Sequence, residues 1–138
     1  MNGKIDDGQP FEDMVSDYME KGFLDNIVSM FKADSDTHSL IVGLLRDERM
    51  RVRIGAVALL EELSEAKMPG LEHIADMLLP LLVDEISFVR GDAAYCLGII
   101  GGPPHIEHLR KLTTDSEKDV REAALEAIDN ITNVKNLI

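Results

Sequence analysis

Three segments of the chain share one pattern, an aspartate followed five residues later by a Val-Arg pair. The aspartates are Asp47, Asp84 and Asp115, and the valines are Val52, Val89 and Val120. Successive valines are therefore 37 and 31 residues apart. Self-similarity at a period of this size is typical of proteins built from stacked helical repeats, so the pattern constrains the fold before any other feature does.

Apolar residues continue each copy of the pattern along one face of a helix. In the first copy, the residues 4, 7, 8 and 11 positions after the valine are Ala56, Leu59, Leu60 and Leu63. This spacing follows the 3.6-residue period of an α-helix. A second apolar stripe precedes each copy, and Pro-Gly and Gly-Pro segments separate the copies, where helices are expected to stop. Each copy is thus predicted to be an antiparallel pair of helices.

These patterns predict an all-α fold, an α-solenoid of about four antiparallel helical hairpins. Three repeats are expected at about residues 37–68, 70–102 and 104–133. Residues 11–36 are predicted to form a degenerate hairpin that caps the N-terminal end, because their acidic surface suits a terminal repeat. Residues 1–10 are expected to be flexible, and Val134, Leu137 and Ile138 to form a short apolar tail.

Charge and composition narrow the class of partner. Lys and Arg number 14 and Asp and Glu 26, which gives a net charge of −12. Because recognition of nucleic acid depends on Lys and Arg, a chain with this negative charge is not expected to bind nucleic acid. The negative charge favours basic or neutral protein partners. Cys96 is the single cysteine, which excludes an internal disulfide, and its position on the core stripe predicts burial. No stretch approaches the roughly 18 apolar residues of a membrane span, so no membrane contact and a cytoplasmic location are expected.

The D-x4-V-R-x-x-A pattern and the stripe that follows it resemble the HEAT-repeat family over roughly residues 37–131. Within that family they are most similar to the short HEAT-like repeats of phycobilisome lyase subunits. The resemblance implies that the turn aspartates and the arginines after the valines stack between repeats as a ladder. The residues concerned are Asp47, Asp84 and Asp115 with Arg53, Arg90 and Arg121. An anion-binding site at the same arginines is the alternative.

The same resemblance implies a non-catalytic scaffold or adaptor, because HEAT-like arrays mostly bind other proteins. In such stacks the second helix of each hairpin lines the concave surface. The residues expected on that face are Ile54, Glu61, Tyr95, Glu122, Glu126 and Asp129. Exposed carboxylates around a tyrosine favour a basic or amphipathic segment of another protein as the ligand. A merely solvated acidic face, and self-association through the ends of the stack, remain alternatives.

A minority of HEAT-like arrays are enzymes. A subunit of a bilin lyase or isomerase is the alternative function that the resemblance implies. Deoxyhypusine hydroxylases carry His-Glu pairs after the Val-Arg, where this chain has Ile54-Gly55, Gly91-Asp92 and Glu122-Ala123. DNA glycosylases of similar fold need a basic groove. Neither of these two activities is expected, and we predict no catalytic residue and no cofactor.

Two Glu-His pairs recur 35 residues apart, at Glu72-His73 and Glu107-His108. Stacked repeats could bring the four side chains together as oxygen and nitrogen ligands of a divalent metal. The simpler interpretation is that these residues face solvent at the start of the first helix of each repeat and recur because the repeat was duplicated. A glutamate at this place suits the positive end of the helix dipole. We therefore predict no metal site.

Overall fold

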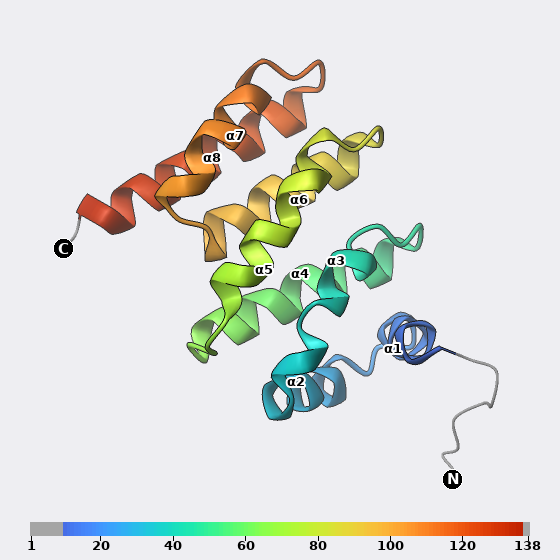
Figure 1. Ribbon diagram of the computed structural model, residues 1–138. Helices are drawn as coiled ribbons and strands as arrows, with labels where there is room; N and C mark the ends of the chain where they lie inside the picture. The colour runs from blue at the N-terminus through green and yellow to red at the C-terminus, as the bar shows by residue number, and fades with distance from the viewer. Residues whose placement is uncertain (1–9, 137–138) are drawn as a thin grey trace, which may run out of the picture. The chain divides into compact units, whose positions relative to one another are not determined.

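The computed structural model describes residues 10–136, with side chains as far as residue 133 (Figure 1). The predicted flexible segment 1–10, apart from Pro10, and the side chains of the predicted tail, Val134, Leu137 and Ile138, lie outside the described residues. The chain forms helices α1 (Phe11–Glu20), α2 (Leu24–Ala33), α3 (Leu40–Leu44), α4 (Met50–Glu65), α5 (Leu71–Leu78), α6 (Ser87–Ile100), α7 (Ile106–Arg110) and α8 (Lys118–Asn136).

Within residues 10–136, four short 3-10 helices join these elements. They are η1 (Ser35–Thr37), η2 (Leu79–Val83), η3 (Pro103–His105) and η4 (Lys111–Thr114). No strand occurs within residues 10–136, so the predicted all-α class is confirmed. Every helix in that range is either too short or too polar to span a lipid bilayer.

The chain divides into two compact units, residues 1–63 and 64–138, and the division falls within α4. In the first unit, α1 packs against α2 and α3. Gly55 on α4 makes room for α1, since a Cβ atom at this position would lie only 2.5 Å from Cγ of Met19. His38 ties the end of α2 to η1, because its Nε2 lies 2.8 Å from the carbonyl oxygen of Phe31. The first unit is therefore held by direct contact between its helices.

The second unit consists of two helical hairpins. α5 and η2 pack on α6, and α7 and η4 pack on α8. The second helices of the two hairpins, α6 and α8, also lie side by side (Figure 1). They approach closely at Gly98, where an added Cβ would be 2.9 Å from the Cα of Ala127. This packing positions the site described below.

The predicted apolar stripe forms the core. Val52, Val89 and Val120 are at most 2% exposed, and the alanines four residues after them are fully buried. Cys96 is also fully buried, as its place on the stripe predicted. Two residues at stripe positions are only half-buried, Ile100 at the end of α6 and Ile128 in α8. Burial of one stripe per helix is what stabilises such hairpins in water.

Candidate functional site

Each copy of the repeated pattern forms the same hydrogen-bonded turn before its second helix. The aspartate carboxylate accepts a hydrogen bond of 2.9 Å from the backbone N–H two residues later. The arginine of the Val-Arg pair then donates from Nη1 to the backbone carbonyl of that aspartate, over 2.8–2.9 Å. The pairs are Asp47 with Arg53, Asp84 with Arg90, and Asp115 with Arg121. The pattern thus closes a turn inside each hairpin.

One of these arginines also contacts the next hairpin. Arg90 donates from Nε to Oδ2 of Asp115 over 2.8 Å and from Nη2 to Oδ1 over 3.0 Å. Both side chains are largely covered, with 14% of Arg90 and 9% of Asp115 exposed. Hydrogen bonding to Arg90 lowers the pKa of Asp115, and the same contact raises the pKa of Arg90. Arg90 and Asp115 thus join two neighbouring hairpins. A ladder that continues through Asp47, Arg53, Asp84 and Arg121 stays a prediction.

The first unit contains a contact that the sequence pattern did not predict. Arg49 donates to both carboxylate oxygens of Asp47, at 2.9 and 3.0 Å, and to Oδ1 of Asp17 on α1 at 3.0 Å. The hydrogen bonds from Arg49 lower the pKa of Asp47. Asp17 lies in the N-terminal segment, which lacks the repeated pattern, so the sequence carried no signal for this pair.

A groove of about 350 Å³ lies between α6 and the start of α8. It is lined by Ser87, Phe88, Gly91, Asp92 and Tyr95 of α6, and by Glu117, Asp119, Val120 and Ala123 of α8 and the turn before it. Tyr95 is half-buried, while Phe88 is 40% exposed. The groove therefore combines two aromatic rings with three carboxylates on the surface of the second unit.

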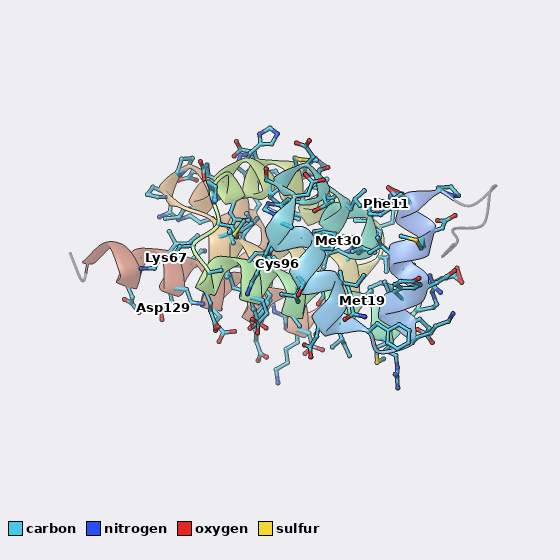
Figure 2. The ribbon with its side chains drawn as sticks, turned by 90° about the horizontal axis from the view of Figure 1, so that it is seen from below. Phe11, Met19, Met30, Lys67, Cys96 and Asp129 are labelled. Atoms are coloured by element: carbon cyan, nitrogen blue, oxygen red, sulfur yellow. The ribbon has the colours of Figure 1, made fainter. Side chains whose placement is uncertain are left out.

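The other predicted binding residues lie elsewhere on the second helices. Glu122, Glu126 and Asp129 are exposed on successive turns of α8, and Figure 2 shows Asp129 pointing away from this helix. On α4, in the first unit, Ile54 is 62% exposed and Glu61 is half-buried. Of the six predicted residues, only Tyr95 lines the groove. The groove's Phe88, Asp92 and Glu117 were not predicted, because the two-helix packing that joins them is not visible in the sequence.

The pairs Glu72-His73 on α5 and Glu107-His108 on α7 are exposed. Glu107 forms an ion pair with Arg110. The neighbouring His105 is 5% exposed, accepts from the Gly102 N–H at Nδ1 over 2.9 Å, and donates from Nε2 to Asp76 over 2.8 Å. Both of its ring nitrogens are therefore used to hold the loop before α7. Among the residues with described side chains, no three His, Cys, Asp or Glu groups come together as a metal site would require.

Comparisons with known proteins relate these hairpins to one family model. The model of HEAT repeats matches residues 37–129. The crystal structure of an engineered protein is similar, with 26% sequence identity and a TM-score of 0.53. That match covers 73% of this chain and 47% of the engineered one, so this chain spans about half of its length. Among curated proteins, none matches. The repeat match, together with the stacked hairpins, confirms the predicted α-solenoid class.

Proposed function

The chain belongs to the HEAT-repeat family, and from this membership we propose that it is a non-catalytic scaffold or adaptor that binds a basic or amphipathic segment of another protein. HEAT repeats commonly mediate protein interactions. The observation that carries the proposal is the groove between α6 and α8, in which Tyr95 and Phe88 lie beside Asp92, Glu117 and Asp119. Aromatic anchors supply binding energy at protein interfaces, and a surrounding charge of one sign selects a partner of the other.

The proposed binding surface extends from the groove along α8. Glu122, Glu126 and Asp129 are three or four residues apart on that helix, so they present their carboxylates on neighbouring turns of one face. Ile54 and Glu61, seven residues apart on α4 of the first unit, stay a separate prediction of partner-binding residues. A basic segment would gain electrostatic attraction along the carboxylates and apolar contact at the rings.

A peptide panel tests this function. Basic and acidic amphipathic peptides of equal length are compared by fluorescence anisotropy at low salt. We expect the basic peptides to bind and the acidic ones not to bind. The double variant Tyr95→Ala, Glu126→Lys should weaken binding at least about tenfold, equivalent to about 1.4 kcal/mol. Circular dichroism should show unchanged helicity.

The matched control is Tyr95→Ala combined with Glu72→Lys. It carries the same tyrosine truncation and the same charge change, but the lysine lies on the exposed start of α5. If this control loses as much affinity as the Glu126→Lys combination, the α8 carboxylates are not part of the surface. If no basic peptide binds the unaltered protein, the proposed function fails.

The alternative function is a subunit of a bilin lyase or isomerase. It depends on the resemblance of the short repeats to those of phycobilisome lyases, and the family match and the engineered protein add no support to that narrower likeness. Titration of a bilin chromophore into the protein separates the two functions, because a bound bilin changes its visible absorbance. A spectrum that does not change leaves the scaffold function as the one to pursue.

A cytoplasmic location and self-association through the ends of the stack also remain predictions. Sedimentation velocity over a range of protein concentrations tests the second of them. A sedimentation coefficient that does not change with concentration would exclude reversible self-association in that range.

A further inference from the structure

Within this proposed function, we propose that the groove between α6 and α8 accepts an arginine side chain of the partner, presented by an extended segment. The groove volume of about 350 Å³ is near the lower end of the roughly 300–1,000 Å³ typical of sites for small molecules. It therefore suits one long side chain better than the row of several anchor residues that an amphipathic helix presents.

The floor of the groove is the backbone of α6 at Gly91. A Cβ atom added there would lie 3.8 Å from Cγ2 of Val120, an ordinary van der Waals contact across the groove. Phe88 and Tyr95 lie three residues before and four residues after this glycine, on the same face of α6. Because glycine adds no side chain, the space beside the two rings stays open to a ligand.

The charge of the lining complements a cation. Asp92 contributes a carboxylate from α6, and Glu117 and Asp119 contribute two from the beginning of α8. Among the lining residues there is no Lys, Arg or His, and the nearby Arg90 uses its guanidinium on Asp115. The two carboxylates near α8 also stabilise the start of that helix, so Asp92 on the opposite wall is needed to hold a cation between the helices.

Arginine fits this combination better than lysine does. A guanidinium is planar, stacks on aromatic rings and can bond a carboxylate with two parallel hydrogen bonds. It is also more weakly hydrated than an ammonium group, so partial burial beside Phe88 and Tyr95 costs it less. The groove should therefore discriminate between two side chains of equal charge.

The test uses short peptides in which a single arginine, lysine or citrulline is flanked by glycine and serine. Binding is followed by amide chemical shifts of the full-length, ¹⁵N-labelled protein. We expect saturable shifts at Gly91, Tyr95 and Asp119 with the arginine peptide, several-fold weaker binding of the lysine peptide, and no binding of the neutral citrulline peptide.

Two substitutions at one position localise the ligand. Gly91→Leu should fill the groove and abolish the shifts, whereas Gly91→Ala should retain them, because its methyl group makes only an ordinary contact. Asp119→Asn provides a second test that adds no bulk, and it should weaken binding several-fold. Equal binding of the arginine and citrulline peptides, or unchanged binding to Gly91→Leu, would overturn the inference.

Two outcomes separate a failure of the arginine site from a failure of the scaffold function. If a basic helical peptide binds and loses affinity with Glu126→Lys but not with Gly91→Leu, the arginine site is wrong and the scaffold function stands. If no basic peptide of either kind binds, both are wrong.

Discussion

The side chain of Arg90 holds its own turn and also contacts the next hairpin. Its Nη1 closes its own turn on the carbonyl oxygens of Asp84 and Glu85, while its Nε and Nη2 form a forked pair with the Asp115 carboxylate. Because the pair is mostly covered by protein, its attraction is less screened by solvent than that of the exposed ion pair between Lys118 and Glu122. The contact therefore links α6 to the turn before α8.

Asp115→Asn should lower the free energy of unfolding at pH 7 by about 2 kcal/mol, the scale of hydrogen bonds to a charged group. The pKa of Asp115 is lowered in the folded state from the ordinary value of 3.8, so its stabilisation is present above that value and is lost as the pH falls through the folded pKa. Urea unfolding from pH 7 to pH 3 should show the variant and the unaltered protein converging below about pH 4.

The exposed Asp129 provides the control for this profile. Asp129→Asn should change the free energy of unfolding at pH 7 by less than about 0.5 kcal/mol, because this side chain is exposed. A difference between Asp115→Asn and the unaltered protein that stays constant down to pH 3 would mean that the carboxylate charge does not stabilise the contact.

At the scale of the element, α6 uses two glycines in opposite ways. Gly91 faces the open groove, whereas Gly98 lies against the backbone of α8. Both lie inside a helix, where glycine is less favourable than alanine by about 0.8–1.0 kcal/mol. The local cost is thus the same at the two positions, and the neighbouring helix decides whether an added methyl group is tolerated.

Alanine substitutions at these positions should have opposite signs. Gly91→Ala should raise the free energy of unfolding by about 0.5–1 kcal/mol, because helix propensity improves with no clash. Gly98→Ala should lower it by about 1 kcal/mol or more, because the new Cβ would lie 2.9 Å from Cα of Ala127 and α8 must move. Chemical denaturation measures both. A stabilising Gly98→Ala would show that α6 and α8 are not packed this closely.

At the scale of the whole molecule, the dominant physical property is the net charge of −12. Repulsion among like charges destabilises a compact state, while the same field attracts basic partners. Both effects extend over the Debye length and weaken with salt. Added salt should therefore raise the stability of the fold and lower the affinity for a basic partner.

Raising NaCl from about 10 mM to about 100 mM shortens the Debye length from about 30 Å to about 10 Å. We expect the melting temperature measured by circular dichroism to rise, since repulsion is screened, and the affinity for a basic peptide to fall over the same range. KCl should act like NaCl, because the effect depends on ionic strength. A melting temperature that falls with salt would mean that attractive ion pairs outweigh the repulsion.

The helices and turns could be predicted from the sequence because they depend on short-range order. A 3.6-residue period places Val52, Val89 and Val120 on buried faces wherever each helix lies. The aspartate and arginine of each copy are six residues apart, and a hydrogen bond joins them within one turn in all three copies. Family membership follows from the same local pattern, repeated three times.

Contacts between separate helices were decided by the tertiary structure alone. Asp17 reaches Arg49 from a distance of 32 residues, and Arg90 reaches Asp115 from 25, and no local period encodes either separation. The groove exists because Gly91 faces Val120 across two packed helices, while seven residues later Gly98 lets the same helices touch. Local periodicity determined which side chains are buried, and the close approach of helices determined which carboxylates and rings meet, because that approach depends on the volume of side chains distant in sequence.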